Sequence, residues 1–344
     1  MSPVDLLRLG GSSVDVCRVG FGCCPMGGHG WGDVERDELI DAVHAALDHG
    51  VNLFDTADVY VKGEAERALA EAIRDLPREQ LVIATKCMGR VWDGPLGRGL
   101  SRKHVFDACD QSLKRLGLDY IDLYQFHAPD ADTPIEESLR AFEDLVRMGK
   151  VRYVGFSNFD HHPKLANEVA VIQKRENWTR MISSQPRWNL VDRHVEKEHV
   201  AYCRRFGLGM IVYSPLAQGV LTNKYAGGAR PEGSRATNDF KHFLESEKAL
   251  TPENVAAAER FGAWCADRGL LPAPVAIAWV LRHEVVASAI VGATSEAQLD
   301  QNLLALEVNL TDAEWRQVEA AIAGRKPGVA GKQRVGARKA KGKK

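Results

Sequence analysis

The sequence predicts an α/β fold of the closed (β/α)8 type, a TIM barrel, and three observations support this prediction. Eight short apolar runs of strand length recur along the 344 residues, at intervals of roughly 30 residues. Amphipathic segments of helical length separate these runs, with apolar residues three and four positions apart. A chain of this length fits a single barrel, and 45% hydrophobic residues suffice for a sizeable core.

The expected strands are the apolar runs themselves. They span 18–24, 51–57, 81–87, 120–127, 152–158, 180–186, 209–215 and 288–293. The clearest helical patterns lie at 35–50, 103–117 and 134–150. Each of these patterns has a glycine at or near its end, which is the residue preferred just beyond a helix C-terminus.

Three further segments complete the expected barrel. Gly10 and Gly11 separate two short runs near the N-terminus and predict a hairpin. A long loop from about 216 to 250 follows the seventh strand, and loops of that length usually have a function. A last helix is expected over 312–324, with Thr311 as its N-cap.

The composition is that of a globular protein without a membrane segment. No run approaches the roughly 20 apolar residues of a membrane span, and the first residues lack the features of a secretory signal. We therefore expect a cytoplasmic protein. The seven cysteines are odd in number and scattered, which is typical of reduced thiols. Neither Cys-x-x-Cys nor His-x-x-x-His occurs, so local spacing predicts no metal site.

The charge is unevenly distributed along the chain. Residues 325–344 carry nine Lys or Arg and no acid, which leaves 36 basic and 46 acidic residues in 1–324. We expect 1–324 to form one barrel domain and the basic segment to be a disordered, solvated tail. No nucleic-acid or membrane partner is expected, although a basic tail is compatible with both kinds of partner. The oligomeric state is not evident from the sequence.

A dinucleotide-binding open sheet is the alternative fold, because the glycine-rich stretch GFGCCPMGGHG follows the first strand. Its spacing does not match G-x-G-x-x-G, since the third glycine would fall at Pro25. The next strand also lacks an acidic ribose ligand in the expected place. The barrel remains the preferred prediction.

Four ionisable side chains follow the ends of three expected strands. Asp55 and Tyr60 follow the second strand, Lys86 ends the third and His127 ends the fourth. In a barrel the C-terminal strand ends form the active face, so the four should lie at one mouth. Each alone has a structural explanation, such as a helix cap, a surface lysine or a core histidine. Together they predict a site, because burying a lysine and an aspartate is costly unless they pair.

These four residues suit the delivery of a proton to a carbonyl oxygen. A phenol has a pKa near 10, and a lysine ammonium close to Tyr60 would lower it. Asp55 would keep Lys86 charged and in place, while a neutral His127 would orient the substrate oxygen. Carbonyl reduction also needs a hydride that no side chain can supply, so a nicotinamide cofactor is implied.

Seven motifs occur along the chain in this order: FDTADVY, IATK, YQFHAPD, GKVRYVGFSN, QPRWN, YSPLAQGVLTNKY and VGATSEAQLDQN. In these motifs and their order the chain resembles the aldo-keto reductase family over roughly residues 5–324, in particular its bacterial reductases and its potassium-channel β-subunit-like branch. The resemblance implies that Asp55, Tyr60, Lys86 and His127 form the catalytic tetrad of an NADP-dependent oxidoreductase, with Tyr60 as general acid.

The resemblance also implies an extended NADP(H) molecule bound without a Rossmann domain. Ser157, Asn158 and Gln185 would hold the nicotinamide carboxamide, and Tyr213 would stack on its ring. The rest of the cofactor would lie between the long loop and the last strand–helix unit. The residues implied there are Ser214, Leu216, Gly219, Lys224, Arg235, Gly292, Thr294, Gln298 and Asn302.

Lys224 and Arg235 are the expected cations for the cofactor phosphate, because the body of the chain is acidic. Near the 2′-phosphate many family members have Arg or Lys, whereas this chain has Thr294 and Ser295. The substrate is expected to be a small carbonyl compound, and the residues do not identify it. An apolar, partly aromatic wall is expected from Trp31, Met88, Trp92 and Trp188.

Two alternative functions remain open at this stage. The β subunits of voltage-gated potassium channels are similar, and they sense the cofactor while turning over slowly. A barrel aldolase would instead use Lys86 as a Schiff-base nucleophile. The reductase is the preferred prediction.

Overall fold

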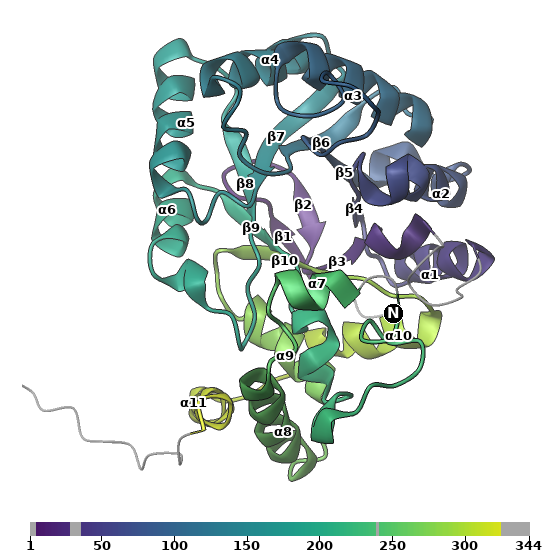
Figure 1. The fold of residues 1–344 in the computed structure, drawn as a ribbon, viewed down its shortest axis with the longest axis vertical. Coiled ribbons are helices and arrows are strands. Elements are labelled where there is room, and N and C mark those ends of the chain that lie inside the picture. Colours follow the sequence, from purple (N-terminus) through teal and green to yellow (C-terminus); the bar gives the residue numbers. More distant parts are fainter. Residues whose placement is uncertain (1–4, 28–35, 239–240, 325–344) are drawn as a thin grey trace, which may run out of the picture.

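Eight parallel strands close into a barrel, as predicted, and helices surround it (Figure 1). The computed structural model describes residues 5–27, 36–238 and 241–324, so Trp31 and the basic segment 325–344 lie outside the described residues. Closure comes from pairing of the last strand, β10, with the first barrel strand, β3. The barrel strands are β3 (Val19–Gly22), β4 (Leu53–Asp55), β5 (Val82–Cys87), β6 (Ile121–Phe126), β7 (Val151–Ser157), β8 (Met181–Gln185), β9 (Gly209–Val212) and β10 (Val286–Val291).

The helices pack their apolar faces on the outside of the barrel. In the third of them, Ser101 accepts a hydrogen bond from the His104 N–H, and Gly117 ends the helix at φ 66°. The α helices are α1 (Arg36–Asp48), α2 (Glu64–Ile73), α3 (Arg102–Leu116), α4 (Ile135–Arg147), α5 (Pro163–Glu176), α6 (His199–Phe206), α7 (Lys241–Ser246), α8 (Pro252–Ala266), α9 (Pro272–Leu281), α10 (Glu296–Leu303) and α11 (Asp312–Ile322).

The predicted N-terminal hairpin consists of β1 (Leu6–Arg8) and β2 (Asp15–Cys17), which pair antiparallel. Its turn contacts the start of β9, where the Gly11 N–H donates to the Gly207 carbonyl at 2.7 Å. A Cβ on Gly10 would lie 2.5 Å from two backbone oxygens, so only glycine fits there. The apolar side chains Leu9 and Val16 join the core inside the barrel. The hairpin therefore closes the N-terminal end and leaves the other end for a site.

The long loop after β9 has more local structure than the sequence predicted. It contains two 3₁₀ turns, Ala217–Thr222 and Ala226–Gly228, and the short helix α7. The prediction for the last helix is confirmed, since Thr311 caps α11 and forms a reciprocal capping box with Glu314. Among the described helices, none has the length and apolar character needed to cross a membrane.

Candidate active site

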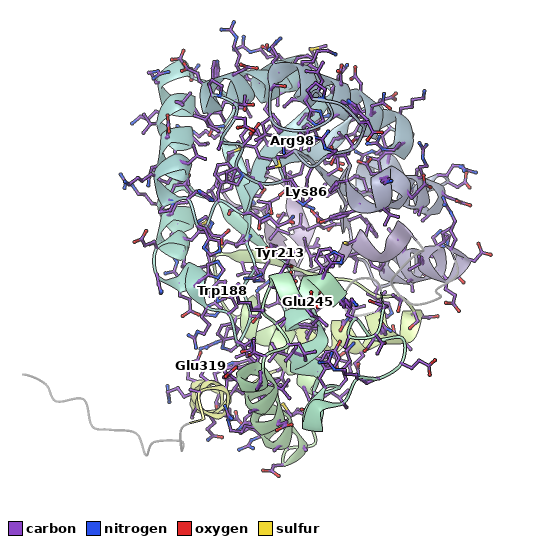
Figure 2. All side chains as sticks on the ribbon, viewed as in Figure 1. Lys86, Arg98, Trp188, Tyr213, Glu245 and Glu319 are labelled. Carbon is purple, nitrogen blue, oxygen red and sulfur yellow. The ribbon has the colours of Figure 1, made fainter. Side chains whose placement is uncertain are left out.

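Lys86 and Asp55 form a buried ion pair inside the barrel, near its C-terminal mouth. The Lys86 side chain has no exposed surface, and Figure 2 places it within the ring of helices. Its Nζ donates to Asp55 Oδ1 at 2.5 Å, to the Thr56 carbonyl at 2.8 Å and to the Tyr60 hydroxyl at 3.4 Å. An ammonium has three protons to donate. Three acceptors therefore match a charged lysine and leave no lone pair for nucleophilic attack.

The second carboxylate oxygen of Asp55 accepts hydrogen bonds from two amides. Gln185 Nε2 lies 2.7 Å from Oδ2 and Gln125 Nε2 lies 3.2 Å from it. Gln125 was missed by the sequence analysis, although a signal was present. It stands two positions before His127, so strand alternation turns both toward the same face. Its register partner on β5 is Lys86, which places it next to the ion pair.

The Tyr60 hydroxyl lies next to the ion pair, but its environment differs from the prediction in one respect. Burial raises the pKa of its hydroxyl well above the usual 10, and Cys24 and Asp55 add to the rise. The expected lowering by Lys86 does not dominate, because burial of the hydroxyl has the largest effect on its pKa and the Asp55 carboxylate acts in the same direction. The phenol is therefore fully protonated at neutral pH.

His127 faces Tyr60 edge-on, with ring centroids 5.7 Å apart. Burial, with the nearby Lys86 charge, lowers the pKa of its imidazole to about 3. A neutral imidazole has one N–H to donate, which suits a hydrogen bond to a substrate oxygen. The four residues predicted to form a tetrad thus lie together at one end of the barrel.

We expect His127 to stay neutral between about pH 5 and 8, the range in which an ordinary histidine titrates. Because its pKa is lowered, the charged form should appear only as the pH falls toward 3. Imidazole NMR signals followed over this range should show no titration of His127. His194 provides an internal reference whose pKa is shifted in the opposite direction, since hydrogen bonds to Asp160 and Asp192 raise its pKa to about 9. A midpoint for His127 inside the range would contradict the assigned neutral role.

The residues predicted to hold the nicotinamide are joined by hydrogen bonds at the mouth. Asn158 donates to the His127 carbonyl at 2.8 Å and accepts from the Tyr213 hydroxyl at 2.8 Å. The Ser157 hydroxyl donates to the Gln185 carbonyl at 2.8 Å. The Gln185 amide itself is directed at Asp55. The structure therefore brings these four residues to the tetrad.

The remaining cofactor candidates follow the ends of β9 and β10. The Lys224 side chain folds back over Gly219, a residue with a φ angle of 88°. Arg235 lies close enough to Glu247 and Cys24 to interact electrostatically with both. The other candidates divide between the start of the long loop and the α10 region. Ser214 and Leu216 belong to the former, and Gly292, Thr294, Gln298 and Asn302 to the latter.

The predicted substrate wall is only partly assembled. Trp188 is a core residue and not a pocket residue, since its indole is 1% exposed, stacks on His283 and donates to Glu196. Trp92 packs against His104 of α3 with ring centroids 4.8 Å apart. Met88, in the same loop, is partly buried against the core.

Comparisons with known proteins agree with this geometry. A sequence model described as "Aldo/keto reductase family" matches residues 18–323. The chain belongs to this family. The aldo-keto reductase fold explains why the tetrad candidates sit at the C-terminal strand ends, the active face of a closed parallel barrel.

Three similar proteins illustrate the range of the family. "Probable voltage-gated potassium channel subunit beta" of Oryza sativa subsp. japonica is 35% identical, over 92% of this chain and 95% of its own length. "NADH-specific methylglyoxal reductase" of Escherichia coli (strain K12) is 33% identical, over 90% of this chain and 95% of its own length. "L-glyceraldehyde 3-phosphate reductase" of Escherichia coli O157:H7 is 35% identical, over 86% of this chain and 87% of its own length. The aldo-keto reductase assignment thus covers nearly the whole chain.

Proposed function

We propose that this chain reduces an aldehyde or ketone to an alcohol with NADP(H), and that Tyr60 donates the proton. The observation that supports the proposal is the hydrogen bond from the buried Lys86 ammonium to the Tyr60 hydroxyl, 3.4 Å long. His127 lies edge-on to the Tyr60 ring, as an active-site partner of the substrate oxygen would.

In this proposal each of the four tetrad residues has its own role in the proton transfer. The nicotinamide supplies a hydride when it is bound. Tyr60 gives its proton to the carbonyl oxygen, and the hydrogen bond from Lys86 stabilises the phenolate left behind. Asp55 and the Thr56 carbonyl hold Lys86 in place. A neutral His127 donates to the substrate oxygen and fixes its position relative to Tyr60.

Lys224 and Arg235 are the groups in the long loop that fit the cofactor phosphates. Burial lowers the pKa of Lys224, and the neighbouring positive charge of Arg235 lowers it further. Burial also lowers the pKa of Arg235. Two cations held close together repel each other, and a phosphate group beside both would relieve that repulsion. This fit supports NADP(H) or another dinucleotide, and we propose NADP(H).

Replacing both cations, Lys224→Glu with Arg235→Glu, should raise the NADPH dissociation constant at least about tenfold, because each charge-assisted hydrogen bond contributes roughly 1.5–3 kcal/mol. Fluorescence titration with NADPH and NADH measures the effect. A larger change for NADPH would assign the pair to the 2′-phosphate, and equal changes would assign it to the pyrophosphate.

The matched control changes two exposed cations nearby, Arg230→Glu with Lys241→Glu, and alters the net charge by the same amount. This variant should bind NADPH nearly as the parent protein does. An unchanged dissociation constant in the Lys224 and Arg235 variant would remove the proposed phosphate role.

Steady oxidation of NADPH in the presence of aldehydes, keto-sugars or larger ketones tests the reaction itself. The expected result is multiple turnovers with at least one small carbonyl compound. Tight cofactor retention with negligible turnover would instead support a cofactor sensor of the channel β-subunit type. The assembled tetrad and the reductase relatives favour turnover. An aldolase is disfavoured, because Lys86 is committed to three acceptors as an ammonium.

A further inference from the structure

A cluster of ligand-type side chains lies on the loops that follow β7 and β8, where Asp160 is close enough to Tyr213 to interact with it electrostatically. Asp160 and His161 come just after Asn158, and His194 lies 34 positions beyond Asp160. Asp160 Oδ2 is 2.5 Å from His194 Nε2 and 3.4 Å from His161 Nε2. The ligand atoms of all three residues lie within 4.8 Å of one another. The proposed carbonyl reduction uses none of the three.

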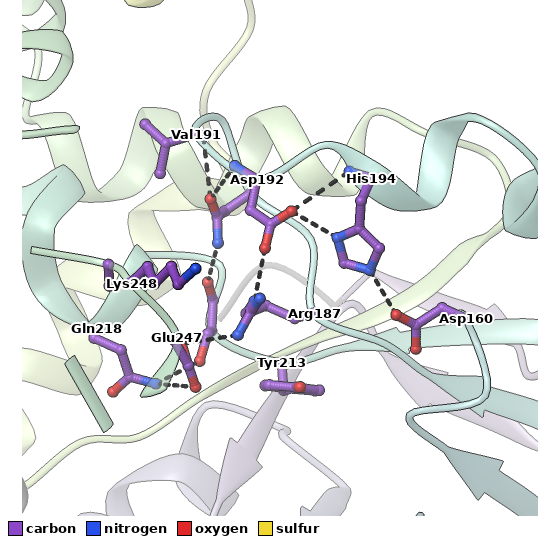
Figure 3. A network of polar contacts seen from close by, with 12 residues as sticks. Asp160, Arg187, Val191, Asp192, His194, Tyr213, Gln218, Glu247 and Lys248 are labelled. Carbon is purple, nitrogen blue, oxygen red and sulfur yellow. Dashed lines mark hydrogen bonds and ion pairs between the residues drawn. The ribbon is translucent and has the colours of Figure 1, made fainter. Parts of the chain in front are cut away.

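A fourth residue orients the central imidazole. His194 Nδ1 lies 2.6 Å from Asp192 Oδ1, and the other oxygen of Asp192 accepts from Arg187 at 2.8 Å (Figure 3). A carboxylate bonded to one ring nitrogen places the proton there and leaves the lone pair on the other nitrogen. In the ion-free protein a proton bridges His194 Nε2 and Asp160. An ion that replaced this proton would meet the Nε2 lone pair of His194, while Asp192 kept the proton on Nδ1.

We propose that Asp160, His161 and His194 bind a divalent transition metal ion, with Zn²⁺ as the ion that suits the donors best. Two imidazole nitrogens and one carboxylate oxygen are typical zinc ligands. His161 is 62% exposed, so the site opens to solvent and water can take a fourth position. The ion would tie together the two loops that flank the nicotinamide-binding residues.

One ligand separation matches that of a tetrahedral ion, and a second is shorter. Zinc bonds of about 2.0–2.1 Å place neighbouring ligand atoms about 3.3 Å apart. The 3.4 Å separation of His161 Nε2 from Asp160 Oδ2 already matches this spacing. The separation of Asp160 from His194 is shorter by about 0.8 Å, and it would widen when the ion replaces the bridging proton.

The local charge favours a cation at this point. The Asp160 side chain is 4% exposed, and its Oδ1 has no hydrogen-bond partner. Carboxylate oxygens of Asp160 and Asp192 lie 2.5 Å and 2.6 Å from the two ring nitrogens of His194, so two negative charges meet at this point. A proton alone could serve the two carboxylates. In that case His161 would only stack on the His194 ring, with ring centroids 4.3 Å apart. To bind an ion, the exposed His161 ring has to rotate out of this stack, and His161 therefore distinguishes a metal site from a simple ion pair.

Isothermal titration of the full chain with Zn²⁺, at mildly alkaline pH, tests the proposal. We expect one Zn²⁺ per chain, no binding of Mg²⁺, and at least tenfold weaker Zn²⁺ binding in His161→Ala. Asp192→Asn should weaken binding about 10- to 100-fold, as outer partners of metal-bound histidines do. His161 is exposed, so its replacement should leave folding intact.

His162→Ala is the matched control, because His162 is an exposed neighbour in the same turn and makes no side-chain cap to α5. It should bind Zn²⁺ as the parent protein does. Absence of binding to the parent, or equal binding by His161→Ala, would overturn the proposal. Equal losses in His161→Ala and His162→Ala would overturn the assigned ligands. None of these readouts depends on turnover, so they are independent of the proposed reaction.

Discussion

Tyr60→Phe is expected to bind NADPH as the parent protein does and to lose about 10²- to 10⁴-fold in kcat, the usual contribution of a general acid. The change removes one oxygen atom and keeps the ring that packs near His127. The proton donor would be lost, while Lys86 would keep its bonds to Asp55 and Thr56. Steady-state rates of NADPH oxidation and a fluorescence titration of NADPH separate the two effects.

Tyr124→Phe is the control for this variant. Tyr124 is a fully buried tyrosine on the outer side of β6, where its ring stacks on Phe142 of α4. Removing its hydroxyl should leave both kcat and cofactor affinity nearly unchanged. Full activity in Tyr60→Phe would rule out the proposed acid, whereas equal losses in both variants would indicate a general effect of removing buried hydroxyl groups.

Much of the fold was predictable because local signals and barrel geometry agree. The eight apolar runs predicted eight strands, and each lies at its expected place. Thr311 was predictable as a cap because threonine followed by glutamate three positions later is a helix-start signal. The helix α7 within the expected loop was missed, because six residues are too few to show the helical spacing of apolar residues.

Site residues at strand ends could be predicted from the sequence, whereas the positions of site residues in the loops were harder to predict. Asp55, Lys86 and His127 follow directly from strand order, because parallel strands meet at one mouth. Trp188 was misplaced because the chain turns after Gln185, and the sequence does not reveal which side of the turn faces the core. Asp160 and His194 are 34 positions apart, so no local spacing could reveal their contact. The raised pKa of Tyr60 depends on burial, which only the structure shows.

Lys86→Met should abolish most turnover and lower the free energy of unfolding by about 3–5 kcal/mol, the usual loss when one partner of a buried ion pair is removed. Asp55 would then carry a buried charge supported only by the amides of Gln125 and Gln185. Adding Asp55→Asn removes that charge. We expect the double variant to regain most of the stability and none of the turnover, as measured by urea unfolding and NADPH oxidation.

Lys103→Met provides the comparison that isolates burial. Lys103 Nζ lies 2.5 Å from Asp107 Oδ2, the same separation as between Lys86 and Asp55, but the Lys103 side chain is 62% exposed. Water screens that pair, so its loss should change the free energy of unfolding by less than about 1 kcal/mol. Similar losses for the two lysines would contradict the idea that desolvation makes the Lys86 pair important. A fully active Lys86→Met would contradict its role in stabilising the Tyr60 phenolate, because no other described cation donates to that hydroxyl.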